Sequence, residues 1–260
     1  MTATKPHPKC WANSLGACSV KLSREHLISA SVFPNSKGIT VFGFPWCREK
    51  PITVGLSSLT SKVLCLSHNS LLSVLDTEAG NVYRTFNEMS ELVNKRASLN
   101  EQKFKVRHYR FNGPLIERWL LKTLINLCYD DKLFIGSEST LPGRPDDRHV
   151  RICFNKDRFS GHAGLYVAAK VGGSFASGPA LNFSPLIADG THVLGGFFNF
   201  RGLLLFLSLM DEQLPQDFNW VDGLNSLDWK GTAPSWHFKK LVIKANGVRS
   251  HVVHFDWGSK

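Results

Sequence analysis

Hydrophobic residues recur at helical spacing in two stretches of the chain, and each stretch predicts an amphipathic helix. The first helix is expected to begin at Asn69, a residue type that is favoured at helix N-termini. Its apolar positions are Leu71, Leu72, Leu75, Ala79, Val82 and Phe86, and Gly80 interrupts this pattern at a modest cost. The second helix is expected over about residues 113–129. Its apolar positions are Leu115, Ile116, Trp119, Leu120, Leu124 and Leu127.

Short apolar or alternating runs bounded by turn residues predict strands in the rest of the chain. Before the first helix these runs are residues 27–33, 38–44 and 52–55. Residues 104–110 alternate basic with apolar or aromatic side chains, which predicts a strand with one cationic face. After the second helix the runs are residues 150–154, 164–171, 192–200, 203–209, 238–245 and 250–257. We therefore expect an α+β fold whose residues 150–260 are mainly antiparallel β-structure.

A turn-rich segment from Pro142 to Asp147 divides these two kinds of pattern. It predicts one domain over residues 1–145, which carries both helices, and a β-rich domain over residues 146–260. A chain of 260 residues is long enough for one or two domains with a substantial core.

The composition is that of a globular protein with a polyanionic partner. Hydrophobic residues make up 43% of the chain and aromatic residues 11%, which excludes a disordered protein. The formal net charge is +10 and the pI is about 9.4. Such a balance favours nucleic acid, and DNA first, because contacts to phosphates dominate its binding.

Neither a leader nor a membrane span is expected. The N-terminal residues have no apolar core of the signal-peptide kind. The most apolar run, residues 193–210, contains Asn199 and Arg201 and is more typical of buried strands than of a spanning helix. Six cysteines in 260 residues are too few for a disulfide scaffold. We expect a cytoplasmic protein with reduced thiols, in which a zinc site is favoured over a disulfide.

Three cysteines and one histidine supply a complete set of zinc ligands. Cys10, Cys18, Cys65 and His68 offer three thiolates and one imidazole, which is a regular structural zinc set. Cys47 is the alternative to Cys10 as the fourth ligand. The other two cysteines, Cys128 and Cys153, lie in apolar runs and are expected in the core.

Polar residues beside these ligands can hold a second ion. Glu25 and Asn69 offer oxygen ligands, which suit Mg²⁺ or Mn²⁺. His26 follows Glu25 directly and can serve as a general base. Together these residue types are the functional groups that a metal-dependent phosphodiesterase uses.

The order of these residues resembles that of the HNH, or His-Me finger, endonucleases. The resemblance covers residues 10 to about 85 and lies in the segments KCWANSLGACSVKLSREHLISASVF and KVLCLSHNSLLSVLD. It implies a zinc-stapled ββα-metal finger over residues 10–90, of the type with asparagine at the last motif position. In that unit Asn69 opens the helix and binds the catalytic ion, and Ser73 stands where a second metal ligand often occurs.

The chain departs from the family pattern at two positions. Seven residues separate Cys10 from Cys18, where the family commonly has two, and His68 replaces the commoner cysteine. Nucleases of this kind with an extra domain occur in phages, mobile elements and antiviral defence, which is a context that the resemblance suggests.

The leading hypothesis is therefore a DNA endonuclease in which His26 is the general base, Glu25 and Asn69 hold the divalent ion, and zinc is structural. A non-catalytic zinc-stapled module that binds nucleic acid is the first alternative. The second is an interaction protein whose β-rich half carries the function.

Several other polar residues have two interpretations each. Asp76 and Glu78 either face the metal site or pair on the helix surface with bases such as Arg84. The basic residues 103–110 and Arg118 either bind phosphates and stack on bases or form a solvated charged face. His237, His251 and His254 invite a metal site, but the spacing of the last two puts them on opposite faces of a strand.

Overall fold

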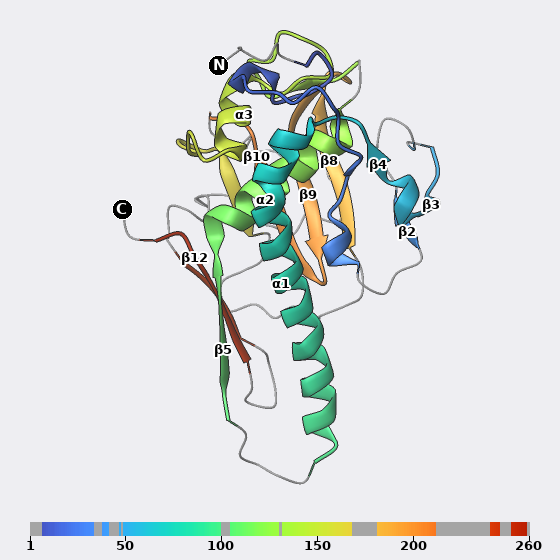
Figure 1. Ribbon diagram of the computed structural model, residues 1–260. Helices are drawn as coiled ribbons and strands as arrows, with labels where there is room; N and C mark the ends of the chain where they lie inside the picture. Colours follow the sequence, from blue (N-terminus) through green and yellow to red (C-terminus); the bar gives the residue numbers. More distant parts are fainter. Residues whose placement is uncertain are drawn as a thin grey trace.

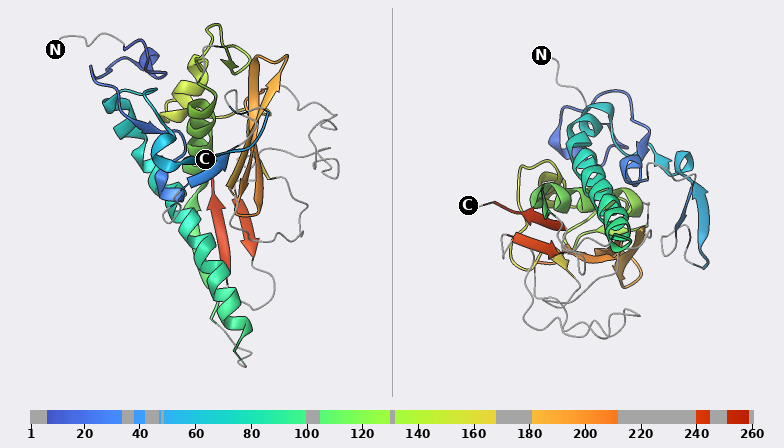
Figure 2. Two further views of the ribbon diagram at one scale, coloured as in Figure 1. Left: turned by 90° about the vertical axis from the view of Figure 1, so that its right-hand side faces the viewer. Right: turned by 90° about the horizontal axis from the view of Figure 1, so that it is seen from below.

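The computed structural model describes residues 7–33, 38–41, 47, 49–99, 105–129, 132–167, 181–211, 240–244 and 251–258. These residues form an α+β fold, as expected. Helix α2 (Gly113–Cys128) lies at its centre, between the long helix α1 (Leu66–Ala97) and a sheet (Figure 1, Figure 2). None of the described helices is both long and apolar enough to cross a membrane.

Two short antiparallel strands precede α1 and form a ββα unit with it. They are β1 (Glu25–His26) and β4 (Thr60–Ser61), in which Glu25 lies opposite Ser61. Backbone bonds extend the pairing at both ends, from Leu27 N to Leu59 O at 2.8 Å and from Ser23 N to Leu64 O at 2.8 Å. Between the two strands lie the hairpin β2 (Gly38–Val41) and β3 (Ile52–Gly55) and the 3-10 helix η3 (Leu56–Ser58).

The expected strand over residues 27–33 is wrong. After His26 the chain turns, and residues Ala30–Val32 form the 3-10 helix η2. The Ser29 hydroxyl donates to Asp76 on α1 and accepts a bond from the Trp119 indole on α2. These bonds direct the segment toward the helices, so it cannot continue as a strand.

Helix α1 begins earlier than expected, and Asn69 does not open it. Cys65 is the N-cap residue, because its sulfur accepts a bond from His68 N at 3.5 Å, so Asn69 lies in the first turn. The helix passes through Gly80 without interruption. A Cβ at this position would lie 2.8 Å from the Cβ of Ser31, so glycine allows η2 to approach α1 closely.

The second half of the described chain is rich in strands. Its main sheet has the order β6-β9-β10-β7, with β8 paired to β9. The strands are β6 (Phe134–Ile135), β7 (Gly164–Val167), β8 (Leu181–Ala188), β9 (His192–Phe200) and β10 (Leu203–Ser208). The pairs β8–β9, β9–β10 and β10–β7 are antiparallel, as expected, and the short β6 runs parallel to β9.

A second sheet joins the two halves of the chain. Its order is β11-β12-β5, from β11 (Lys240–Lys244), β12 (His251–Asp256) and β5 (Arg107–Asn112). Strand β5 pairs in parallel with β12, so residues from both sides of the predicted boundary share one sheet. The division into two domains stays a prediction.

Two of the strand expectations in this half need correction. Residues 150–154 belong to helix α3 (Asp147–Cys153) and its C-cap, because the Asp146 carboxylate caps His149 N at 2.9 Å and starts a helix there. Strand β8 was not among the expected strands; its Pro185 is tolerated because β8 pairs on one side only among the described residues. The expected strand residues 42–44, 104, 168–171, 238–239, 245 and 250 lie outside the described residues.

Buried polar residues on α2 connect the central helix to the other parts of the fold. Asn126 accepts a bond from the Trp11 indole at 3.0 Å. Glu117 accepts bonds from Leu165 N at 2.8 Å and from the Trp257 indole at 3.3 Å. Lys122 bonds to β1 and α1, as described below. Since each buried polar group is bonded to a different segment, α2 can occupy one position only.

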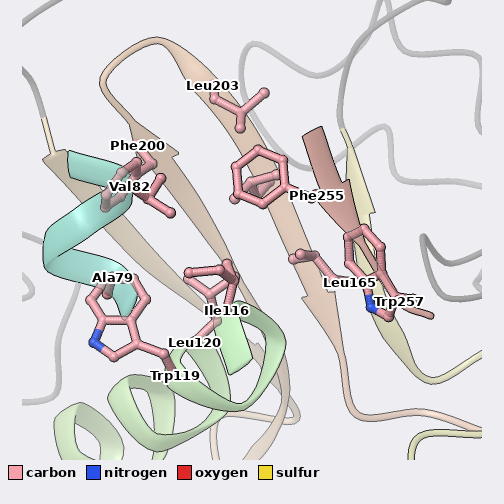
Figure 3. A pocket seen from close by; sticks show the side chains of 11 residues that line it. Ala79, Val82, Ile116, Trp119, Leu120, Leu165, Phe200, Leu203, Phe255 and Trp257 are labelled. Carbon is pink, nitrogen blue, oxygen red and sulfur yellow. The ribbon is translucent and has the colours of Figure 1, made fainter. Parts of the chain in front are cut away.

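The cavity beside α2 is a packing void. Only apolar and aromatic side chains line it, from α1, α2, the main sheet and the C-terminal segment (Figure 3). Its volume is about 20 Å³, which is room for about one water molecule. A void of this size has no room for a substrate.

Glu117 makes the stability of the fold depend on pH. Burial raises its pKa to about 7 from 4.5, although the bonds from Leu165 and Trp257 oppose the shift. Because the folded-state pKa is the higher one, the stabilisation is complete below pH 4.5 and is lost as the pH rises through 7. The free energy of unfolding should fall by roughly 3 kcal/mol over this window. Urea unfolding at pH 4.5 and pH 8 should show this fall in the native chain and a much smaller one in Glu117→Gln. Equal falls in both would contradict the assignment.

Candidate metal centre and adjacent polar site

Cys10, Cys18, Cys65 and His68 come together in the structure. All four are buried, and their ligand atoms lie within 4.8 Å of one another. His68 Nδ1 lies 3.3 Å from the sulfur of Cys10, 3.3 Å from that of Cys65 and 3.7 Å from that of Cys18. The edges of a tetrahedral zinc site are about 3.5–3.8 Å long. The cluster can therefore hold a structural metal ion such as zinc.

The local structure explains the long spacing between the first two cysteines. The 3-10 helix η1 (Asn13–Leu15) fills part of the loop between them. Gly16 and Ala17 follow with positive φ angles of 73° and 51°, which reverse the chain toward Cys18. Trp11 N bonds to Val63 O at 3.0 Å and holds this loop against the segment before α1. Cys47 is buried but is not part of the cluster, so Cys10, and not Cys47, completes the candidate ligand set.

The pKa values of three of the four candidate ligands are shifted by their surroundings, and a metal ion bound here would replace the protons of the thiols. Burial raises the pKa of the Cys10 thiol to about 12. Burial also acts to raise the pKa of Cys65, but hydrogen bonds from His68 N and from Ser19 lower it below its usual value. Burial and the nearby Lys156 lower the pKa of His68, so its imidazole is neutral at pH 7 and can donate a lone pair.

A buried lysine joins the ββα unit to α2. Lys122 Nζ lies 2.6 Å from Glu25 Oε1 on β1, and 2.9 Å and 2.8 Å from the two carboxylate oxygens of Asp76 on α1. The side chains of Lys122 and Glu25 are 2% and 6% exposed, so water screens their attraction very little. Asp76 therefore points into the fold, and the surface pairing with Arg84 is wrong; Arg84 bonds to Asn81 instead.

Burial and the neighbouring charges act in opposite directions on this cluster. Burial raises the pKa of Glu25, although Lys122 acts to lower it. For Lys122 burial acts to lower the pKa, but Asp76 and Glu25 together raise it, so the ammonium group stays charged.

The candidate catalytic residues stand beside this cluster on neighbouring elements. His26 follows Glu25 on β1, opposite Thr60, and is half-buried. Asn69 Nδ2 donates to Ser23 Oγ at 2.8 Å, so the amide group is oriented and its Oδ1 remains for an ion. Glu25 bonds to Lys122 through Oε1, so Oε2 is its remaining oxygen. An ion shared by Glu25 and Asn69 stays a prediction.

Other candidate residues of the sequence have structural partners. Ser73 Oγ donates to Ser70 O at 2.8 Å within α1, and Glu78 accepts a bond from Asn112 N at 2.7 Å. Cys128 and Cys153 are fully buried, as expected. His251 is buried and His254 partly exposed, which agrees with opposite faces of β12. His237 lies outside the described residues.

Sequence reasoning missed two polar contacts. One is Lys122, whose signal is a lysine within the apolar run from Leu120 to Leu127 of α2. The other is a contact between His108 Nδ1 and His254 Nε2 at 3.2 Å, which depends on the parallel pairing of β5 with β12. Pairing between strands so distant in sequence leaves no local signal.

Comparison with known proteins adds no assignment: no protein-family model, curated protein or solved structure matches this chain.

Zinc content tests the metal centre. Native protein should carry one zinc ion per chain, and Cys65→Ser should lose it and unfold the N-terminal unit, because structural zinc supplies folding energy. Cys47→Ser is the matched control, because Cys47 is also buried but lies outside the cluster. Elemental analysis and circular dichroism measure both effects. Zinc retained by Cys65→Ser, or lost by Cys47→Ser, would refute the ligand set.

Lys122→Met should be strongly destabilising. It leaves the carboxylates of Glu25 and Asp76 without their buried cation, which typically lowers the free energy of unfolding by about 3–5 kcal/mol. Lys156→Met, at an exposed position, should change it by less than about 0.5 kcal/mol. Urea unfolding measures both variants. A loss below about 1 kcal/mol for Lys122→Met would show that the buried ion pairs do not hold the fold.

Proposed function

We propose that this protein is a metal-dependent endonuclease of the HNH type that hydrolyses phosphodiester bonds in DNA. The observation that carries the proposal is the ββα unit itself. Its first strand bears Glu25-His26, the first turn of its helix bears Asn69, and a Cys3His cluster joins that helix start to the N-terminal loop. The formal charge of +10 supports a nucleic-acid substrate.

In this proposal, zinc bound at the Cys3His cluster has a structural role. The N-terminal loop and the start of α1 are distant in sequence, so a metal ion that crosslinks them would stabilise the unit. Strand β1 follows Cys18 in the chain, and strand β4 precedes Cys65, so both strands lie next to this crosslink. Zinc binding would therefore fix the strand that carries His26.

Glu25 and Asn69 would hold a divalent ion, Mg²⁺ or Mn²⁺, through Glu25 Oε2 and Asn69 Oδ1. Such an ion supplies electrostatic stabilisation of the charge that develops on the scissile phosphate. Two protein oxygens are a typical number for Mg²⁺, which keeps several waters. The bond from Lys122 to Glu25 and the bond from the Asn69 amide to Ser23 Oγ orient the two side chains before any ion is bound.

His26 would accept the proton of the attacking water. A half-buried imidazole is open to solvent on one side, and the β1–β4 pairing fixes its backbone. A general base needs the neutral form of the imidazole.

The second candidate is a zinc-stapled module that binds nucleic acid without cleaving it. The observation that favours it is the Lys122–Glu25 ion pair, because a carboxylate that already has a cation partner attracts a divalent ion less strongly. In that case Glu25 and His26 are dispensable for function while Cys65 remains essential. A cytoplasmic location is part of both proposals, and the six described cysteines, which form no disulfide, agree with it.

Cleavage of plasmid DNA by native protein and by His26→Ala tests the proposed function. With added Mg²⁺ or Mn²⁺, the variant should cleave about 10²–10⁴-fold more slowly, because a general base contributes that factor to the rate. Its zinc content and circular dichroism should equal those of native protein. His162→Ala is the matched control, since His162 is exposed and lies outside the ββα unit.

Two outcomes would count against the nuclease. Equal rates for His26→Ala and native protein would refute the mechanism. No cleavage by either, together with binding of the same DNA, would favour the non-catalytic module.

A further inference from the structure

An arm projects from the body of the fold. The C-terminal half of α1 extends beyond the main sheet, and β5 and β12 run beside it (Figure 1, Figure 2). A groove of about 460 Å³ lies between α1 and β5. Its walls are Glu78, Asn81, Arg84, Thr85 and Glu88 from the helix and residues His108–Phe111 from the strand.

Four basic side chains on this arm form no ion pair in the described part of the chain. Arg84 and Arg110 line the groove, and Lys105 and Arg107 stand on the approach to β5. The groove walls carry two acids, Glu78 and Glu88, beside the two arginines, and Lys105 and Arg107 add positive charge next to them. The Glu78 carboxylate accepts a bond from Asn112 N, whereas Glu88 is exposed.

Aromatic rings accompany these cations. The His108 ring lies nearly parallel to that of His254, at 24°, with centroids 5.5 Å apart. His108 is exposed, and the neighbouring Tyr109 is half-buried in the same wall. Unpaired cations next to exposed flat rings are the combination that binds single-stranded nucleic acid, because phosphates meet the charges and bases stack on the rings.

We propose that the groove between α1 and β5 binds a single-stranded segment of the nucleic-acid substrate. In placing this segment next to the cleaved bond, the proposal rests on the nuclease function above. Helix α1 sets the distance between the proposed ion site and the groove. Arg84 lies fifteen residues after Asn69, or about 22 Å along the helix axis. A single strand whose bases stay stacked at the duplex rise of roughly 3.4 Å covers this distance with about six nucleotides. The preferred substrate is therefore a duplex with an unpaired tail of about six nucleotides or more.

Binding tests the groove without any cleavage. The probe is a fluorescein-labelled 12-nucleotide oligo-dT, titrated with zinc-loaded full-length protein without added magnesium or manganese, at several NaCl concentrations. The double variant Arg84→Gln/Arg110→Gln should bind at least tenfold more weakly. Its slope of log affinity against log salt should be smaller by about 1.4, or about 0.7 for each lost phosphate contact.

Two further variants complete the binding test. Glu88→Gln should bind about threefold more tightly, because it removes the repelling carboxylate. Lys156→Gln/Arg158→Gln, with two exposed cations on the loop after α3, is the control and should bind like native protein. All variants should keep native zinc content. An unchanged affinity for the double variant, or for Glu88→Gln, would overturn the proposal and leave the groove to another ligand, such as an extended peptide added to β5.

Cleavage kinetics separate this proposal from the nuclease function. With Mg²⁺, a duplex with a ten-nucleotide tail should have a lower KM than the blunt duplex. The double variant should raise the KM of the tailed substrate at least tenfold and leave kcat unchanged, because Arg84 lies about 22 Å along α1 from Asn69. Equal KM values for tailed and blunt duplexes in an active enzyme would refute the proposed role of the groove and leave the nuclease function standing. Specific binding of oligo-dT by a protein that cleaves nothing would refute the nuclease function and support the proposed role of the groove.

Discussion

The buried ammonium group of Lys122 is the interaction on which the candidate site depends. It binds Glu25 on β1 and Asp76 on α1 from the centre of α2, in a region where water screens charge very little. Asp76 in turn receives a bond from Ser29, whose hydroxyl also accepts the Trp119 indole. Three elements therefore meet at one cation. Any shift of α2 would separate buried charges, so the position of His26 on β1 is determined from the core of the fold.

The Cys3His cluster and the lysine hold the ββα unit from opposite ends. The cluster lies at the start of α1 and the Lys122 ion pairs lie at β1 and at the third turn of α1. The two strands between them are two residues each and have too few ladder bonds for stability of their own. A metal crosslink on one side and buried ion pairs on the other can keep Glu25, His26 and Asn69 in place, which is what a preorganised site requires.

Some of this arrangement follows from local sequence and some does not. The Cys3His cluster and α2 could be predicted, because Cys-x-x-His at the start of a helix and an apolar helical period are local patterns. The start of α1 at Cys65 and the helix at residues 147–153 were missed, because single side-chain caps decided them. The turn after His26 depends on contacts to Asp76 and Trp119, and the partner of Glu25 lies almost one hundred residues away. Such long-range contacts leave no periodic signal.

Anomalous X-ray diffraction from crystals soaked in Mn²⁺ tests the central claim most directly, since it locates each metal by element. The account predicts a zinc peak about 2.3 Å from the sulfurs of Cys10, Cys18 and Cys65. It also predicts a manganese peak within about 2.6 Å of Glu25 Oε2 and Asn69 Oδ1, next to His26. A zinc peak without manganese at Glu25, while Lys122 keeps its place, would contradict the metal-dependent nuclease.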